Sequence, residues 1–314
     1  MKVLITGGSG SVGSYIVPRL AKRGWEVRVL DKDVDIFKGE EDGIKLIKGG
    51  VEEREKVNQA VRDVDLVIHL AWSFSDEPLE LFEIDLKGLL NLLQASLDNR
   101  VKQFIFVSSA VVYGSPRYTP IDEGHPREVE DSRKPAYAWA KLAAEKLCLV
   151  YHKEKGLPVT NVRFWWGFGE EIGGRHLREM IKTALENKTI QVPRDAGGSF
   201  LLFEDLLLGM DKMMLNDRAF GQTFNLASLY ITWEDLAGMV VDVAGSGRVE
   251  TVPQSEWKGS PFLADVWDLS YKRAGELLGY RPIYPDAEAR RLLKEAIRGC
   301  KERVQRAISG SNNG

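Results

Sequence analysis

Short, fully apolar runs alternate with longer amphipathic stretches along the first half of the chain. Apolar runs of strand length indicate strands that are covered on both faces, and apolar positions that repeat every three to four residues indicate helices. The predicted strands are residues 3–6, 27–30, 46–48, 66–70, 104–107 and 158–164. The predicted helices are residues 12–23, 53–61, 79–97 and 136–155. This alternation predicts an α/β fold with a doubly wound parallel sheet.

The second half of the chain has a less regular pattern. The helices predicted there are residues 175–186, 204–215, 233–243, 271–278 and 287–306. The strands predicted there are residues 190–192 and 224–226. We expect a main sheet domain at residues 1–165 and a smaller α/β portion at residues 166–308 that partly returns to it. A mobile polar tail is expected at residues 309–314.

Composition and charge narrow the class of protein. The chain has 314 residues, with 43 Lys and Arg against 46 Asp and Glu. This near-neutral balance favours neither a nucleic-acid partner nor an anionic membrane surface, and no apolar run approaches the ~20 residues that a membrane span requires. The first residues lack a signal-peptide pattern. Two cysteines and four histidines, without metal-ligand spacing, predict neither a disulfide framework nor a metal site. We expect a cytoplasmic enzyme that acts on a small molecule.

A glycine-rich segment directly follows the first predicted strand. Gly7, Gly10 and Gly13 form the pattern G-x-x-G-x-x-G, with Ser11 and Val12 inside it, and a predicted helix begins there. Glycines let the backbone turn tightly and approach a pyrophosphate, whose charge is stabilised by the helix N-terminus. The segment therefore predicts dinucleotide binding in a Rossmann fold.

Asp31 and Lys32 follow at the end of the second predicted strand. A carboxylate at this place accepts hydrogen bonds from the ribose hydroxyls of the adenosine. It also repels a 2′-phosphate, so NAD is favoured, whereas Lys32 leaves NADP as the less favoured cofactor. The charged run at residues 52–56 is predicted to be solvated.

Tyr137 and Lys141 form a Y-x-x-x-K unit on a predicted helix. Their spacing places both side chains on one face, where the ammonium is expected to lower the pKa of the phenol. Ser109 follows the end of the fifth predicted strand, and ligands of such sheets bind at the carboxyl ends of the strands. The three residues predict proton transfer at a substrate alcohol, with Tyr137 as general acid/base.

These motifs together resemble the extended short-chain dehydrogenases/reductases. Within them the chain is similar to the NAD-dependent epimerase/dehydratase family, whose best-known members are the UDP-glucose 4-epimerases. The resemblance covers nearly the whole chain. The stretches that carry it are residues 7–13, 69–71, 107–114, 137–141, 162–169, 203–205 and 278–282.

The resemblance implies a catalytic triad of Ser109, Tyr137 and Lys141, and a homodimer that pairs the helices at residues 79–97 and 136–155. With the neighbouring residues, the predicted cofactor site comprises Gly7, Gly10, Ser11, Val12, Gly13, Asp31, Lys32, Val51, Leu70, Ala71, Trp72, Val107, Tyr137 and Lys141. The predicted substrate site comprises Trp72, Ser73, Ser109, Ala110, Trp165 and Trp166.

Four positions depart from the family's pattern. Gly50 stands where the family has an adenine-binding Asp, so adenine recognition is expected to rest on Val51 or on backbone groups. Asp85 stands in place of an Asn. Trp166 replaces a substrate-side Asn, and residues 197–199 (Gly-Gly-Ser) fill the region of a phosphate-binding Arg.

The last two departures concern the nucleotide-sugar pocket, because a diphosphate is well bound by an Arg fork. Either the substrate lacks UDP or a shifted cation holds it, for which Arg175, Arg178 and Arg194 are candidates. Ala110 and Val111 stand where dehydratases and decarboxylases of the family carry acidic residues, which argues against elimination.

Three functions stay open. The first is NAD-dependent hydride transfer at a secondary alcohol of a sugar-like substrate, as in a nucleotide-sugar 4-epimerase. The second is an NAD(P)-dependent ketone reductase or alcohol dehydrogenase for an apolar substrate without a nucleotide, which Trp166 and the missing Arg favour. The third is a non-catalytic dinucleotide sensor, which the presence of Ser109, Tyr137 and Lys141 disfavours.

Overall fold

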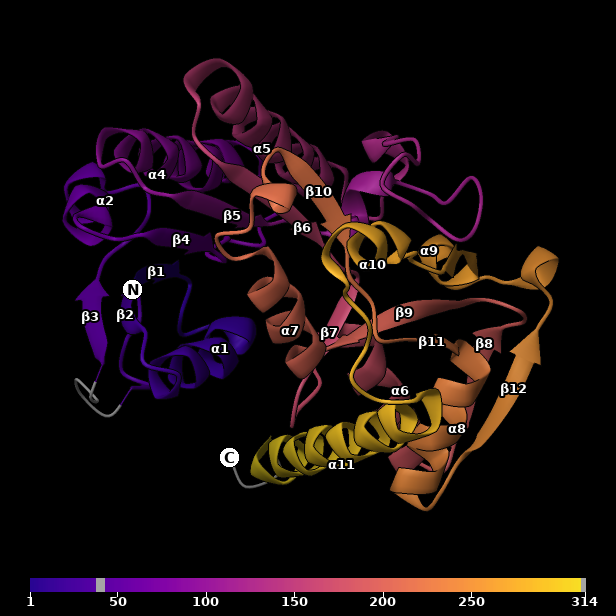
Figure 1. Cartoon of the computed structure of the whole chain (residues 1–314). Helices are drawn as coiled ribbons and strands as arrows, with labels where there is room; N and C mark the ends of the chain where they lie inside the picture. Colours follow the sequence, from indigo (N-terminus) through magenta and orange to yellow (C-terminus); the bar gives the residue numbers. More distant parts are fainter. Residues whose placement is uncertain (38–42, 312–314) are drawn as a thin grey trace.

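A computed structural model describes residues 1–37 and 43–311, and a parallel sheet forms its centre (Figure 1). Among these residues the sheet has the order β10-β6-β5-β4-β1-β2-β3, and all neighbouring strands are parallel. Its strands are β1 (Lys2–Thr6), β2 (Glu26–Asp31), β3 (Ile44–Lys48), β4 (Leu66–His69), β5 (Gln103–Val107), β6 (Val159–Arg163) and β10 (Gln222–Asn225). The predicted doubly wound sheet is confirmed.

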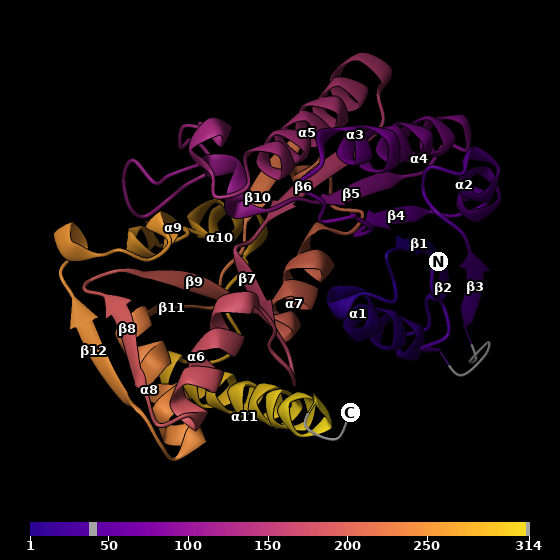
Figure 2. The ribbon, with the colours of Figure 1, turned by 180° about the vertical axis from the view of Figure 1, so that it is seen from behind.

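Helices cover both faces of this sheet (Figures 1 and 2). One face carries α2 (Arg54–Val61), α4 (Lys87–Asp98) and α5 (Pro135–Lys155). The other face carries α1 (Ser11–Lys22), α7 (Phe203–Met213) and α10 (Lys272–Leu278). Alternate strand residues point to opposite faces: Val3 and Ile5 of β1 join the core under α1 and α7, whereas Leu4 joins the core under α2, α4 and α5.

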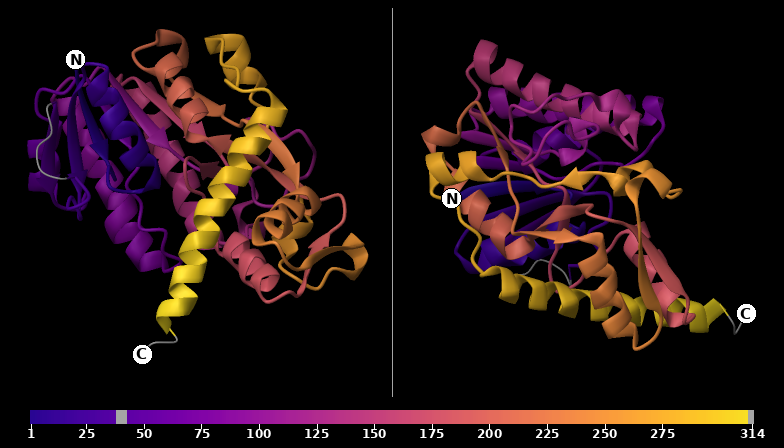
Figure 3. Two further views of the ribbon diagram at one scale, coloured as in Figure 1. Left: turned by 90° about the horizontal axis from the view of Figure 1, so that it is seen from below. Right: turned by 90° about the vertical axis from the view of Figure 1, so that its right-hand side faces the viewer.

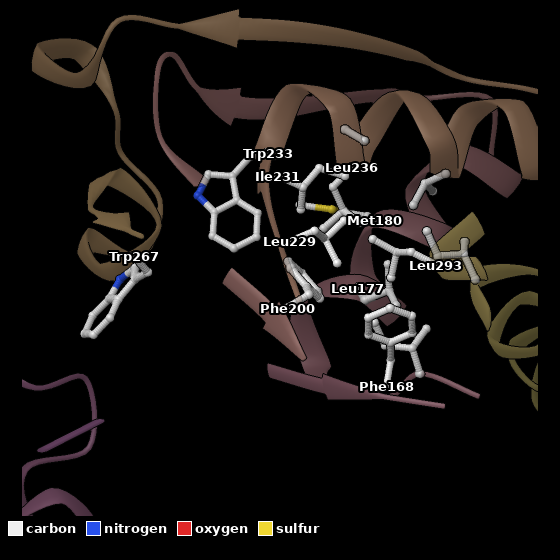
Figure 4. Packing of buried hydrophobic residues seen from close by; sticks show 14 of the residues in the cluster. Phe168, Leu177, Met180, Phe200, Leu229, Ile231, Trp233, Leu236, Trp267 and Leu293 are labelled. Carbon is white, nitrogen blue, oxygen red and sulfur yellow. The ribbon is translucent and has the colours of Figure 1, made fainter. Parts of the chain in front are cut away.

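The second half of the chain builds a smaller portion beside the main sheet. Its strands are β7 (Trp166–Phe168), β8 (Thr189–Pro193), β9 (Gly197–Leu202), β11 (Leu229–Thr232), β12 (Arg248–Val252) and β13 (Val266–Trp267). Its helices are α6 (Arg175–Leu185), α8 (Trp233–Ala244), α9 (Pro261–Ala264) and α11 (Asp286–Ser311). Figure 4 shows its separate core, in which Phe168, Phe200 and Leu293 meet. β10 also comes from this half of the chain, and it extends the main sheet next to β6.

Helix α11 lies along one side of the molecule and includes residues 309–311, the first part of the predicted tail (Figure 3). The remaining tail residues, 312–314, lie outside the described part of the chain. No helix among the described residues has both the length and the apolar character needed to cross a membrane.

The segment predicted as one helix at residues 79–97 has a mixed geometry. It begins as α3 (Pro78–Glu80), passes through a π-helical turn at Leu81–Leu86 and continues as α4. Single π turns inside helices often lie at functional sites, and this one carries Asp85, which is almost fully buried.

A buried ion pair joins helix α5 to the sheet. Arg163 at the end of β6 donates from Nε and Nη2 to the two carboxylate oxygens of Glu145, at 2.8 and 2.5 Å. Both residues are almost inaccessible to solvent. The same guanidinium donates to the Tyr113 hydroxyl at 2.8 Å, and that hydroxyl donates to Asn225 of β10 at 2.6 Å. One cation therefore connects α5, β6, β10 and the turn after β5.

We predict that Arg163→Leu lowers the free energy of unfolding by about 3–5 kcal/mol, because it leaves the Glu145 carboxylate buried without its partner. Urea unfolding followed by circular dichroism measures this change. The double variant Arg163→Met with Glu145→Leu should lose less, since it buries no unpaired charge. Arg291→Leu, at an exposed ion pair, should cost less than about 1 kcal/mol. Equal losses for Arg163→Leu and Arg291→Leu would contradict this reading.

Candidate functional site

The glycine loop lies where the sheet changes its winding direction, between β1 and β4. Gly7 has a positive φ of 71°, and a Cβ there would lie 2.6 Å from the backbone nitrogen of Ala71. A Cβ on Gly13 would lie 2.4 Å from the carbonyl oxygen of Gly7. Gly10 precedes α1 without a side-chain cap, and the first turn of that helix carries no acidic residue. The first amides of α1 therefore stay available for a pyrophosphate.

Two cavities meet at this loop and share the lining residues Gly7, Gly10, Leu70 and Phe74. The first has a volume of about 380 Å³ and lies over Ser109, Tyr137 and Lys141. The second has a volume of about 500 Å³ and extends past Asp31 to residues 49–52. Every residue predicted for the cofactor site lines one of the two cavities.

Four of the six residues predicted for the substrate site line one of the two cavities, and two do not. Ser109 and Trp165 line the first cavity, and Trp72 and Ser73 line the second. Neither cavity's described lining includes Ala110 or Trp166. Ala110 is fully buried. Trp166 stacks on Phe200 and donates from its indole nitrogen to the carbonyl of Gly173 at 2.9 Å.

Asp31 closes the outer end of the second cavity. Its carboxylate accepts hydrogen bonds from the backbone amides of Ser9 at 2.9 Å and Asp33 at 3.3 Å. Lys32 forms an ion pair with Glu52 at 2.8 Å. Because this lysine is already neutralised by a carboxylate, the cavity end is a poor place for an additional phosphate, which agrees with NAD over NADP.

Glu52 is a site residue that the sequence did not reveal. The charged run was predicted to be solvated, but the structure places the Glu52 carboxylate against Gly50. A Cβ on Gly50 would lie 2.3 to 2.5 Å from the Glu52 carboxylate atoms. Its Oε2 is buried and has no hydrogen-bond partner among the described residues. The carboxylate thus lies beside the position where the family has an Asp, and it offers a free acceptor inside the cavity. An acidic residue two positions after the missing one was the available signal.

Tyr137 and Lys141 lie on one face of α5, at the floor of the first cavity. Lys141 donates from Nζ to the carbonyl of Val107 at 3.0 Å, and its ammonium lies 3.7 Å from the centre of the Trp72 ring. Phe74 stacks on the Tyr137 ring with the centroids 5.8 Å apart. Ser109, after the end of β5, lies next to the phenol and interacts with it.

The electrostatics of this pair differ from the prediction. Burial lowers the pKa of Lys141 to about 7, although Asp85 and Glu145 oppose the shift. Burial and the negative charge of Asp85 raise the pKa of Tyr137, while Arg133 and Ser109 act in the opposite direction. The expected lowering of the Tyr137 pKa is therefore wrong for the protein alone, because desolvation of the phenol and the charge of Asp85 outweigh the groups that would lower the pKa.

Asp85 is buried beside this pair and positions the loop after β4. Its carboxylate accepts from the backbone nitrogen of Ser73 at 2.8 Å and from the Ser73 hydroxyl at 2.5 Å. Burial raises the pKa of Asp85, and the Lys141 ammonium opposes this shift. With Asp where the family's pattern has Asn, a buried acidic group lies near Tyr137 and Lys141.

His69 is a core residue at the end of β4. Thr6 Oγ1 and His69 Nδ1 are 2.7 Å apart, and burial lowers the pKa of the imidazole to about 3, so the ring is neutral at physiological pH. Among the described residues, no group of three or more His, Cys, Asp or Glu side chains is arranged to hold a metal ion.

Arg133 is the second site residue that the sequence did not reveal. It lines the first cavity at the start of α5, with its guanidinium carbon 4.5 Å from the centre of the Phe262 ring. The three arginines proposed instead, Arg175, Arg178 and Arg194, are absent from the described lining of both cavities. Arg175 is paired with Glu179 at 2.7 Å on an exposed face of α6. A cation four residues before Tyr137 was the available signal for Arg133.

Comparison with known proteins supports the interpretation of these motifs. The profile of the NAD dependent epimerase/dehydratase family matches residues 3–227. The chain is 32% identical over 220 residues to a UDP-glucose 4-epimerase of Lactobacillus helveticus, a match that covers 65% of this chain. It covers 64% of that protein, so the chain spans just under two thirds of this relative.

A second relative matches over more of its length. The chain is 28% identical over 326 residues to UDP-glucuronic acid decarboxylase 6 of Arabidopsis thaliana, covering 95% of this chain and 89% of that protein. The solved structure of Pal from Bacillus thuringiensis has a TM-score of 0.79 and 25% identity, covering 96% of this chain and 100% of that one.

The family profile covers well over half of the chain, including the glycine loop and the Tyr137 and Lys141 pair. It confirms the predicted family, and with it an NAD-dependent enzyme class. The chain belongs to the NAD-dependent epimerase/dehydratase family of the extended short-chain dehydrogenases/reductases.

Proposed function

We propose that this protein transfers a hydride between NAD and a secondary alcohol or ketone of a small, sugar-like molecule, with Tyr137 as general acid/base. The observation that carries the proposal is the convergence of Ser109, Tyr137 and Lys141 on one cavity that the glycine loop also lines. The loop and the triad are far apart in sequence, and a purely structural turn would not require their juxtaposition at the carboxyl ends of β1 and β5.

The residues present fit NAD. The uncapped start of α1 would hold the pyrophosphate, Asp31 the adenosine ribose, and the free Glu52 oxygen the amino group of adenine. Lys141 would hold the nicotinamide ribose. When bound, NAD supplies the hydride acceptor and a positive charge close to Tyr137. With that charge present, Tyr137 would first release its own proton to solvent, and the phenolate would accept the proton of the substrate hydroxyl, which Ser109 orients; in the reverse direction the phenol would give this proton to a ketone.

The relatives include a UDP-glucose 4-epimerase and a UDP-glucuronic acid decarboxylase. The fully buried Ala110 and the adjacent Val111 offer no acid for elimination after oxidation. We therefore propose an epimerase-like or a dehydrogenase reaction. The two are distinguished by the cofactor: a dehydrogenase releases NADH in proportion to product, whereas an epimerase returns the hydride and needs no added NAD.

We also propose a homodimer. Large apolar side chains stay exposed on neighbouring helical segments at residues 78–98 and on α5, which lie side by side in Figure 2. They are Leu79, Phe82, Leu90, Trp139 and Val150. An apolar surface over two packed helices is typical of an interface between subunits.

Tyr137→Phe should lower kcat by at least about a hundredfold, because the substrate proton loses its acceptor. Turnover would be followed through NADH absorbance or, for epimerisation, by product analysis. Tyr151→Phe, on the same helix but away from both cavities, is the matched control and should stay active. Undiminished turnover in Tyr137→Phe would refute the acid/base role.

Glu52→Gln should weaken NAD binding by about tenfold, since the buried oxygen that would accept from the adenine amino group is replaced by an amide. Titration calorimetry with NAD measures the effect. Glu55→Gln lies in the same charged run but is exposed, and it should bind NAD as the unmodified protein does. If both variants bind NAD equally well, Glu52 has no place in adenine recognition.

The pair of substitutions Phe82→Lys and Val150→Lys should convert the dimer into a monomer, because charges would be buried at its interface. Native mass spectrometry reports the state directly. Ile283→Lys is the control, since Ile283 is exposed on the other portion of the molecule. A monomeric unmodified protein would contradict the proposed dimer.

A further inference from the structure

The substrate end of the first cavity is shaped by the contact between Trp165 and Gly198. A Cβ on Gly198 would lie 2.3 Å from one atom of the Trp165 ring and 2.7 and 2.8 Å from two others. No side chain fits at position 198 of β9 while the indole lies there. Gly198 belongs to the segment in which the family's pattern has its phosphate-binding Arg, and the indole fills the space into which that side chain would extend.

Three rings form an aromatic slot in this part of the molecule: Trp165, Phe262 and Trp267, all of which line the cavity. Trp165 and Trp267 are nearly parallel, at 16°, with their centroids 5.9 Å apart, and Phe262 lies 5.9 Å from Trp165. Trp267 belongs to the same buried core as Phe168 and Leu177, and Figure 4 shows it at one end of that cluster. The aromatic slot offers contact to the flat face of a substrate ring.

The slot ends at a cation that forms no ion pair with a described residue, although the Asp76 carboxylate, which is paired with Lys134, is near enough for its charge to act on it. Of the residues that the structure describes, three cations line the cavity. Lys134 is paired with Asp76 at 2.9 Å, and Lys141 donates to the carbonyl of Val107. Arg133 has neither a hydrogen bond nor an ion pair with any residue that the structure describes, and its guanidinium lies over the Phe262 ring. A guanidinium in this setting is suited to a carboxylate or a phosphate.

We propose that the site takes a compact substrate with a ring-shaped carbon frame and one anionic group, a carboxylate or a phosphate, in place of a nucleoside diphosphate. The aromatic slot contacts the ring, and Arg133 binds the anion. This inference rests on the proposed function, because the alcohol to be oxidised must lie at Tyr137.

The positions of these groups limit the size of the substrate. Arg133 is close enough to Tyr137 for its charge to act on the phenol. The anion and the reacting alcohol must therefore lie within one small molecule. The same cavity, of about 380 Å³, is lined by the glycine loop and also has to admit the nicotinamide end of the cofactor. Little room is left for a second nucleotide.

The test is calorimetric binding to the NAD-saturated protein, with benzoate, phenyl phosphate, benzamide, acetate and UDP-glucose as probes. We expect benzoate or phenyl phosphate to bind at least about tenfold more tightly than benzamide, as expected for a charged hydrogen-bond pair. Whichever anion binds more tightly identifies the group that Arg133 prefers. Acetate should bind more weakly than benzoate, because it has no ring for the aromatic slot.

Arg133→Gln should abolish the preference for the anion, and Arg133→Lys should retain part of it. Arg175→Gln removes a cation outside the cavity and is the matched control. All three variants should bind NAD normally, which reports that they are folded. The proposal is overturned if UDP-glucose binds more tightly than both aromatic anions, if neither aromatic anion binds, or if Arg133→Gln leaves the anion preference unchanged.

These outcomes are separate from the test of hydride transfer. Binding requires no turnover, so the anion preference should persist in Tyr137→Phe even though that variant is expected to be inactive. If Tyr137→Phe stays active while the anion preference holds, the acid/base role fails and the substrate inference stands. If Tyr137→Phe is inactive and UDP-glucose binds best, the substrate inference fails alone.

Discussion

The contact between Arg163 and Glu145 holds helix α5, which carries Tyr137 and Lys141, in its place on the sheet. Tyr137, Lys141 and Glu145 follow one another at intervals of four residues on α5, so they share one face of the helix. The first two residues of this face line the cavity, and the third is bound to the last residue of β6. The face of α5 that carries Tyr137 and Lys141 is thus fixed by two hydrogen bonds of Glu145, one turn beyond Lys141. Removing either charge would leave the other buried within this face.

Most of the main sheet could be predicted because strands such as β1, β4 and β5 have distinct apolar runs. The central strands β4, β5 and β6 are buried along their whole length, and such strands leave a clear signal in the sequence. β9 was not predicted, because it begins with two glycines instead of an apolar run. Gly198 packs against the Trp165 ring, and Gly197 packs against the backbone of β11. The short strand β7 also lacks a run of its own, because it consists of Trp166, Gly167 and Phe168.

The residues of the glycine loop and the triad could be found from spacing alone, since local backbone geometry dictates it. Glu52 and Arg133 could not, because their roles depend on space that another residue leaves free. Glu52 matters only because Gly50 has no side chain, and it resembles any other charge in a solvated run. Trp165 and Gly198 form a similar pair, 33 positions apart: the indole occupies its place only because Gly198 has no side chain. Such compensation is a property of packing and leaves no periodic pattern.

The balance of buried charge sets the pKa values of Tyr137 and Lys141 apart from those of an isolated tyrosinate and ammonium. Burial brings the pKa of Lys141 to about 7, and Asp85 and Glu145 keep it from falling further. The same Asp85 raises the pKa of Tyr137, so the phenol keeps its proton in the protein alone. A positive charge next to the Tyr137 phenol has to oppose the negative charge of Asp85 before the phenol can lose its proton. Arg133 supplies part of it, and under the proposed function the cationic nicotinamide ring of bound NAD would add to it. Asp85, at the position where the family's pattern has Asn, is therefore one of the charges that any proton transfer at Tyr137 has to overcome.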